Sequence, residues 1–276
     1  MTTDVALSEI RREGAWALRG LGYSFGTADR ATPLLVWTEA VCGKGLSLLR
    51  QGEAAIKASV TAPPPRRMRG NAREWIIMAP GKCLFEVGPP AIDLLVADFR
   101  RYGCGHVVLH GAFAQCLTAA LCDLGARRGQ AIVAVYRSST VKGLPDIFGG
   151  AGWIVAAPGL PDPVIFADTP ENAASAIPAV LMALGVARDE KATAALQDDI
   201  MATGNDSRVA LLALACNPRR ESEVAGWRHL TDYAARVRRG YSHGVVAEDA
   251  DYEQLYDLER RTWAPSSERS RAQAAF

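Results

Sequence analysis

The chain has 276 residues, of which 49% are hydrophobic and 22% are charged. This is the composition of a globular protein, and a chain of this length buries enough surface to be stable without disulfides or structural metals. Because 31 basic and 30 acidic residues leave a formal net charge of +1, no overall field attracts nucleic acid or a membrane surface, and neither is an expected partner.

The first sixteen residues, MTTDVALSEIRREGAW, are polar and lack the apolar segment of an export signal. The most apolar stretch, from residue 131 to 157, is interrupted by charged residues and is therefore not expected to span a membrane. Together these features predict a cytoplasmic protein. In that compartment we expect free, mostly buried thiols rather than disulfides at the six cysteines, which lie at positions 42, 83, 104, 116, 122 and 216.

Residues 1–60 are predicted to form a helical segment. A first helix is indicated by apolar residues at helical spacing and is expected to be capped by Asp4 or Ser8 and ended by Gly20 and Gly22. A second helix is expected from Thr27, with Gly43 and Gly45 breaking the pattern near its end. Residues 61–73, TAPPPRRMRGNAR, form the predicted linker, since three prolines favour an extended backbone. Their purely positive charge also leaves a phosphate-binding patch open as an alternative.

Residues 74–185 are predicted to form an α/β sheet domain. WIIMA and CLFEV suggest a hairpin around Pro80 and Gly81, and a helix is expected from Pro90 to Tyr102. Strand HVVLHG, a helix to Arg128, strand AIVAVY, a glycine-rich loop, and strands WIVAAP and VIFAD follow. This alternation is typical of a layered α/β fold. Residues 186–276 are expected to be mostly helical and to end in a polar tail.

Two histidines, His106 and His110, stand four apart in HVVLHG. The β-branched, apolar run predicts a strand, in which residues four apart share a face but lie about 13 Å from each other. They are therefore not expected to bind one metal ion. His110 ends the strand, where ligands of open α/β sheets usually bind; the alternative is a strand-end histidine that hydrogen-bonds a neighbouring loop.

Four segments follow one another at the spacing of a known family: AIDLLVADFRRYGCGHVV, LCDLGARRGQAIVAVYRSS, FGGAGWIVAAPG and VIFADT. Over residues 5–170 the chain resembles the malate/L-lactate dehydrogenase-like family, which includes ureidoglycolate, sulfolactate and cyclic-imine enzymes. The resemblance implies a central sheet domain flanked by an N-terminal helix pair and a helical C-terminal segment. The last third, with RRTWAPSSERSR, resembles a group of uncharacterised bacterial proteins.

This resemblance also implies the residues of a site. The family's serine-histidine-glycine motif falls on Gly43-Lys44-Gly45, so that Lys44 replaces a histidine, and a second family histidine falls on Ala114. Reduction of a carbonyl or imine needs a proton donor or a positive group near the developing charge. Lys44 can supply either, Ala114 can supply neither, and His110 is the candidate second donor.

The resembled enzymes hold their nicotinamide cofactor at the strand end where Ser138 and Ser139 lie. Gly149 and Gly150 in the following loop free the backbone for close approach to a ligand; the alternative is that these glycines simply turn the loop. These four residues are the predicted binding residues for NAD or NADP. We expect a nicotinamide-dependent oxidoreductase that acts on a small-molecule substrate, a 2-oxo acid or a cyclic imine, and forms a homodimer as the resembled enzymes do. Loss of both family histidines favours an alternative, a non-catalytic relative that binds a metabolite or associates as one subunit of a hetero-complex.

Overall fold

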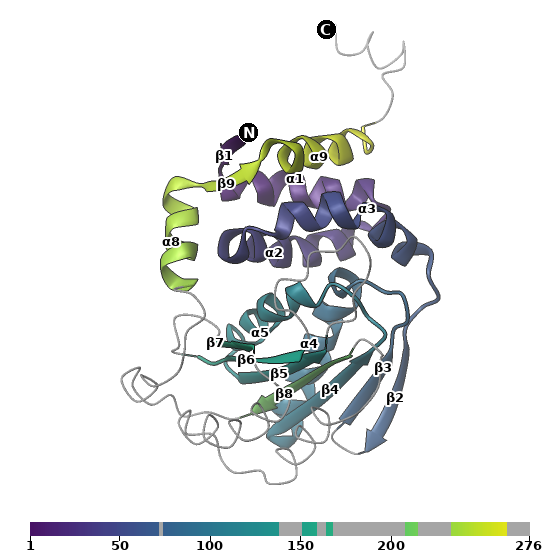
Figure 1. Ribbon diagram of the computed structural model, residues 1–276. Coiled ribbons are helices and arrows are strands. Elements are labelled where there is room, and N and C mark those ends of the chain that lie inside the picture. The colour runs from purple at the N-terminus through teal and green to yellow at the C-terminus, as the bar shows by residue number, and fades with distance from the viewer. Residues whose placement is uncertain (72–73, 138–150, 159–163, 168–207, 215–232, 264–276) are drawn as a thin grey trace, which may run out of the picture.

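The structure, a computed structural model, describes residues 1–71, 74–137, 151–158, 164–167, 208–214 and 233–263. A layer of helices lies against one end of a seven-stranded sheet, and further helices cover one face of that sheet (Figure 1). The predicted fold class, α/β with a central sheet and flanking helices, is confirmed.

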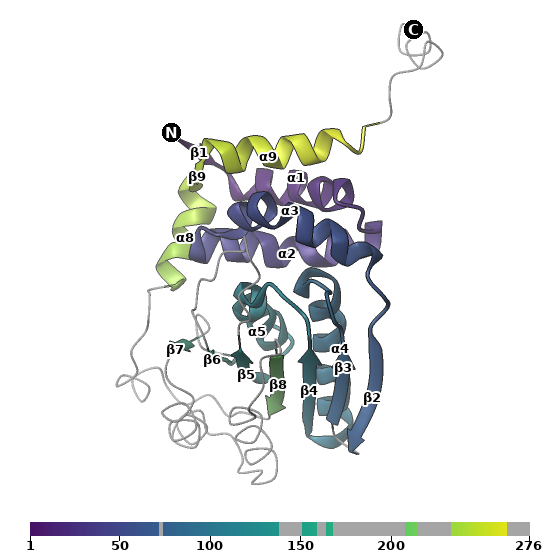
Figure 2. The same ribbon diagram turned by 45° about the vertical axis from the view of Figure 1, so that its right-hand side comes forward.

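Five helices make up what we call the helical layer: α1 (Leu7–Gly20), α2 (Phe25–Cys42), α3 (Gly45–Thr61), α8 (Tyr233–His243) and α9 (Asp249–Arg260). A two-stranded sheet joins the first strand, β1 (Thr2–Val5), to β9 (Val245–Glu248) in antiparallel register. The chain's beginning therefore lies beside a segment from near its end (Figures 1 and 2).

The helix boundaries differ from the prediction at two places. Asp4 belongs to β1 and Ser8 lies inside α1, so the first helix starts after Ala6 without a side-chain cap. The predicted second helix is two helices, because Gly43 adopts a left-handed conformation with φ 60° and ends α2. Ser24 caps α2, accepting the backbone N–H of Thr27 at 3.4 Å.

The large sheet contains β2 (Arg66–Asn71), β3 (Glu74–Met78), β4 (Cys104–His110), β5 (Ala131–Arg137), β6 (Ala151–Ala156), β7 (Val164–Ala167) and β8 (Arg208–Leu214), in the order β2-β3-β4-β8-β5-β6-β7. β3 and β4 are parallel, and β8 is antiparallel to both β4 and β5. β3, β4 and β5 therefore run in one direction and end at one edge. Figure 2 shows the arrowheads of β4 and β5 pointing toward the helical layer.

The predicted hairpin around Pro80 and Gly81 is wrong. β3 leads through a short loop into helix α4 (Leu84–Tyr102), whose first turn is formed by residues expected to be the second strand. A short apolar run does not distinguish a buried strand from a buried helix turn, and this one packs as a helix. Pro90, expected to start the helix, lies inside it.

Two strands lie in segments that were not predicted to contain a strand. β2 lies within the predicted linker and pairs antiparallel with β3 as an edge strand. β8 lies within the segment predicted to be mostly helical, yet it occupies the centre of the sheet between β4 and β5. The sheet is thus assembled from residues distant in the sequence.

Helices α4 and α5 (Thr118–Ala126), with the short helix η1 (Gln115–Leu117), cover one face of the sheet. On that face Val107 and Leu109 of β4 join one continuous core with the helices. Residues on the opposite face are also buried but lie outside that core cluster, among them Val108, Val133, Ala210 and Leu212. Burial on both faces explains why these strands are continuous apolar runs rather than alternating ones.

Within the part of the chain that the structure describes, no helix has the length and apolarity needed to cross a membrane. The five described cysteines are free, as predicted, and four of them are buried: Cys83, Cys104, Cys116 and Cys122. Cys216 lies outside the described residues.

Candidate functional site

The ends of β3, β4 and β5 form what we call the carboxyl edge of the sheet. Here the loops that leave β3 and β4 run side by side. Ala79 N–H donates to the carbonyl of His110 at 2.8 Å, Gly81 N–H to that of Gly111 at 3.1 Å, and Phe113 N–H to that of Lys82 at 3.0 Å. Open α/β sheets bind their ligands at such an edge, so we take it as the candidate site.

The loop after β4 contains a strained backbone position. Ala114, with φ 67°, is the one non-glycine residue of the described chain with positive φ, a conformation that costs an L-amino acid roughly 1 kcal/mol. Buried Gln115 fixes the loop by donating from Nε2 to the carbonyl of Ala112 at 2.8 Å. Strained backbone of this kind gathers at functional sites. Ala114 is also the position that the family resemblance assigned to a missing histidine.

A buried ammonium group lies in the loop after β3. Lys82 is only 3% exposed, and its Nζ donates to the carbonyl of Ser59 at 2.9 Å. It also pairs with the carboxylate of Glu86, at 2.9 Å to Oε1 and 3.2 Å to Oε2. These contacts satisfy the three ammonium hydrogens and connect the end of α3 to the start of α4.

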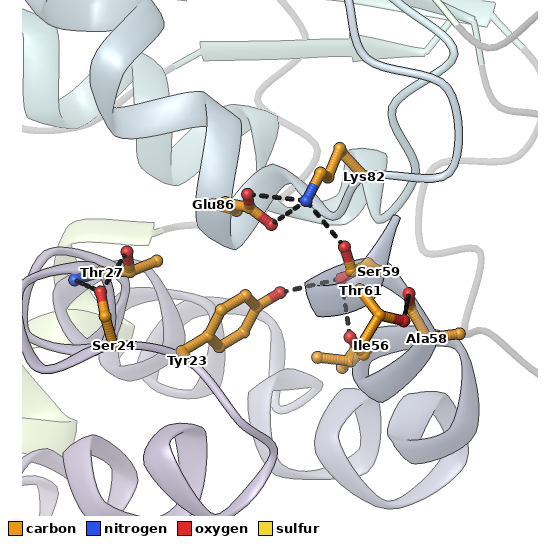
Figure 3. Close-up of polar contacts among 9 residues, drawn as sticks. All are labelled: Tyr23, Ser24, Thr27, Ile56, Ala58, Ser59, Thr61, Lys82 and Glu86. Carbon is orange, nitrogen blue, oxygen red and sulfur yellow. Dashed lines mark hydrogen bonds and ion pairs between the residues drawn. The ribbon is translucent and has the colours of Figure 1, made fainter. Parts of the chain in front are cut away.

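Tyr23 belongs to the same cluster. Figure 3 shows Lys82 and Tyr23 converging on Ser59, whose Oγ lies 3.2 Å from the tyrosine hydroxyl and donates to the carbonyl of Ile56 at 2.7 Å. Burial raises the pKa of the Tyr23 phenol and raises that of the adjacent Cys83 thiol to about 12. Both groups are therefore neutral at physiological pH, and Cys83 is not a thiolate nucleophile.

The strand register aligns basic residues along the carboxyl edge. His110, the last residue of β4, is the register partner of Arg208, the first residue of β8. Arg208 is in turn the partner of Arg137, the last residue of β5. We call His110, Arg208 and Arg137 the basic row. On the other side of His110 the row continues through Met78 of β3 to Arg66 of the edge strand β2.

Arg208 and Arg137 were not among the predicted site residues. Each stands at one end of an apolar strand, AIVAVYR or RVALLAL, and that is the only signal of their position in the sequence. Their alignment depends on the pairing of β8 with β5, which brings together residues separated by about seventy positions and has no local signature.

Of the two predicted catalytic residues, the structure places His110 at the candidate site and Lys44 outside it. His110 is half-buried at the carboxyl edge, and the predicted end of its strand is confirmed. Lys44 is exposed, in the junction between α2 and α3. No contact within the described parts of the chain joins the two residues.

The junction that carries Lys44 is held by its neighbours. The buried carboxylate of Glu39 accepts the N–H of Leu46 at 2.8 Å, and burial raises the pKa of this carboxyl group. The side chain of Lys44 is left in solvent, without the low-dielectric surroundings that a fixed catalytic cation requires. The four predicted cofactor residues, Ser138, Ser139, Gly149 and Gly150, lie outside the described residues.

The histidine pair of β4 follows strand geometry, as predicted. His106 is buried, with its Nδ1 3.5 Å from Oε1 of Glu74 on the neighbouring strand. His110 stands four residues farther along, at the end of the strand. Among the described residues, no group of three or more histidine, cysteine or acidic side chains is placed to hold one metal ion.

Comparison with known proteins gives matches in structure. No family model and no curated sequence matches the chain. A malate dehydrogenase of Pyrococcus horikoshii aligns with a TM-score of 0.63 at 12% identity, over 96% of this chain and 97% of that one. Sulfolactate dehydrogenase of Methanocaldococcus jannaschii aligns with 0.62 at 14% identity, over 93% and 96%.

A third solved structure is delta1-piperideine-2-carboxylate reductase of Pseudomonas syringae, with a TM-score of 0.59 at 15% identity, over 93% of this chain and 99% of that one. The chain therefore has the malate/lactate/sulfolactate dehydrogenase-like fold, as the resemblance implied. The predicted likeness of its last third to an uncharacterised bacterial group stays a prediction.

Proposed function

We propose that the chain is a nicotinamide-dependent oxidoreductase acting on a small 2-oxo acid or a cyclic imine. The observation that carries this proposal is the fold, shared over nearly the whole length with proteins named as malate and sulfolactate dehydrogenases and a cyclic-imine carboxylate reductase. All three names denote chemistry on small carboxylic acids. The comparisons lend no support to the non-catalytic alternative.

The positive charge of the side chains at the carboxyl edge is complementary to an anionic ligand of this kind. His110 and Arg208 are described side chains at this edge, and both can donate hydrogen bonds to anionic oxygen. A dinucleotide carries a diphosphate and a 2-oxo acid carries a carboxylate, so the residues present fit the charge of either. The cofactor, NAD or NADP, supplies the hydride when bound. We assign its binding to Ser138, Ser139, Gly149 and Gly150, which follow β5.

Hydride transfer leaves negative charge on a carbonyl oxygen or imine nitrogen, which a proton or a fixed cation must neutralise. In this proposal Lys44 supplies the positive group and His110 is the second donor. Because Lys44 is exposed in the single chain, its role requires another surface to exclude water around it. A second subunit of the expected homodimer would supply that surface.

The test of this function is turnover, followed through the absorbance of NADH and NADPH with a panel of 2-oxo acids and cyclic imines. At least one compound should be reduced. Lys44→Ala should lower kcat by roughly a hundredfold, the usual contribution of a general acid, while the Kd for the cofactor stays within about twofold. Lys57→Ala, which removes another exposed lysine, is the matched control and should keep wild-type kcat. Unchanged turnover in Lys44→Ala would remove Lys44 from the mechanism.

A further inference from the structure

Strand β2 forms one border of the large sheet. It stands first in the strand order and pairs, among the described strands, with β3 alone. No other described element lies beyond it (Figure 2). Along its six residues, a length of about 20 Å, alternate backbone N–H and C=O groups therefore point away from β3. Such an edge can accept a further strand, and natural proteins usually protect it with charged residues or proline.

The charge on this edge is positive on both faces of the sheet. Arg67 is the register partner of Ile77, which belongs to the core shared with the helices, so Arg67 stands on the helix-covered face and Arg66 on the opposite one. Both are exposed, and within the described parts of the chain neither enters an ion pair. The third arginine, Arg69, pairs with Asp98 of α4 at 2.9 Å, so its charge is compensated inside the chain.

An apolar patch lies beside these charges. Met68 and Met78 are 49% and 39% exposed, and Ile76 is half-buried. They stand on the same face as Arg66, because Met68 is paired with Ile76 and Met78 with Arg66. Protection against pairing needs charge but no exposed apolar side chains, whereas flexible methionines are common on surfaces that bind peptides. Free backbone groups, arginines and methionines together therefore indicate a binding edge.

A second copy of the chain is disfavoured as the occupant of this edge. In an antiparallel pair of β2 strands centred on Met68, Arg67 of one copy would face Arg69 of the other. Like charges directly opposite each other destabilise a sheet, and Arg66 adds to the repulsion. The same arginines attract an acidic strand, so charge complementarity selects the occupant.

We infer that β2 binds an extended acidic peptide segment of another protein, which adds to the sheet as an additional strand. Backbone hydrogen bonds along β2 give such a segment affinity, and its alternating side chains give it specificity. The positions opposite Arg66 and Arg67 are expected to be acidic, one on each face of the sheet, and the position opposite Met68 is expected to be apolar. An antiparallel strand reads apolar-acidic-acidic from its N-terminus at these positions, and a parallel strand reads in the reverse order.

Two fluorescent peptides with blocked ends test this binding on the full chain without nicotinamide: Thr-Thr-Val-Glu-Glu-Thr for an antiparallel strand and Thr-Glu-Glu-Val-Thr-Thr for a parallel one. We expect at least one to bind, measured by fluorescence anisotropy, with an affinity that falls as ionic strength rises. Arg66→Glu combined with Arg67→Glu should weaken that binding by roughly tenfold or more. The same double variant should bind the peptide in which lysine replaces both glutamates, which also shows that the variant is folded.

The matched control is Arg11→Glu combined with Arg238→Glu, which changes the net charge equally at two exposed positions of the helical layer; its affinity for the acidic peptide should equal that of the wild type. N-methylation of the peptide at alternate residues tests strand addition separately. One alternating set should abolish binding and the other should preserve it, because only one set of N–H groups faces β2. Equal loss with both sets contradicts strand addition.

Absence of binding by both acidic peptides overturns the inference, as does equal affinity of the double variant and the wild type. Binding of inorganic polyphosphate that depends on Arg66 and Arg67, without binding of either peptide, would assign the edge to a polyanion instead. A preferential heterodimer of the wild type with the double variant, again without peptide binding, would assign it to a second copy of the chain. Peptide binding needs neither cofactor nor turnover, so its outcome is independent of the oxidoreductase proposal.

Discussion

Replacing Lys82 with methionine is expected to lower the free energy of unfolding by roughly 3 kcal/mol, the lower end of the loss when one partner of a buried ion pair is removed. The side chain of Glu86 is 25% exposed, so water partly solvates the carboxylate left behind, and this keeps the loss from being larger. The carbonyl of Ser59 also loses one of its two donors, and keeps the N–H of Ala62 at 3.2 Å. Methionine has nearly the volume of lysine, so the cavity contribution is small.

Equilibrium denaturation by urea at neutral pH measures this loss. The matched control is Lys57→Met, two residues from Ser59 on α3 but exposed, which should stay within about 0.5 kcal/mol of the wild type. Adding Glu86→Gln to Lys82→Met should recover part of the stability, because the uncompensated charge is then gone. If Lys82→Met is as stable as the wild type, the ion pair does not stabilise the contact between the helical layer and the start of α4.

Gly105→Ala should be comparably damaging, with an expected loss of about 2–3 kcal/mol, in the range of overpacked cores. A Cβ at this position would lie 2.4 Å from the carbonyl oxygen of Leu95 and 3.3 Å from the backbone nitrogen of Phe99. Both atoms belong to the backbone of α4, so no side-chain rotation relieves the overlap. The helix would have to move away from β4 and would carry the loop at the carboxyl edge with it.

Thermal and chemical unfolding of Gly105→Ala beside Gly26→Ala tests this packing. Gly26 is exposed in the first turn of α2, with nothing within 4 Å of its added Cβ. Alanine there should therefore leave stability unchanged or raise it by up to about 1 kcal/mol. A Gly105→Ala protein as stable as Gly26→Ala would mean that α4 does not approach β4 as closely as described.

Local sequence patterns were sufficient for part of the fold. The strand ending at His110 and the alternation of strands and helices follow from short-range apolar patterns, and both are present. The β3–α4 connection was mispredicted as a hairpin, because the apolar run after Gly81, CLFEV, is too short to distinguish the period of a strand from that of a helix. β8 was missed for a related reason, since RVALLAL is too short and uniform to mark a strand in a helical context.

The candidate site was harder to predict from the sequence than the fold class, because its residues are brought together by long-range contacts. Nothing near Lys82 in the sequence indicates burial, which comes from the end of α3 and from Glu86 one helical turn away. Arg208 reaches the carboxyl edge only because β8 inserts between β4 and β5. The family resemblance predicted Lys44 as a site residue, but the structure leaves its side chain in solvent. Sequence motifs locate residues along the chain, whereas register and burial decide which of them meet.

The most direct test of the oxidoreductase proposal is titration of the purified protein with NADH and with NADPH, followed by nicotinamide fluorescence and melting temperature. A ligand that binds only the folded state raises its stability by about 2.7 kcal/mol at a hundredfold excess over Kd. The proposal predicts a saturable fluorescence change with at least one of the two cofactors and a matching rise in melting temperature. Absence of both signals with both cofactors at millimolar concentration would contradict it.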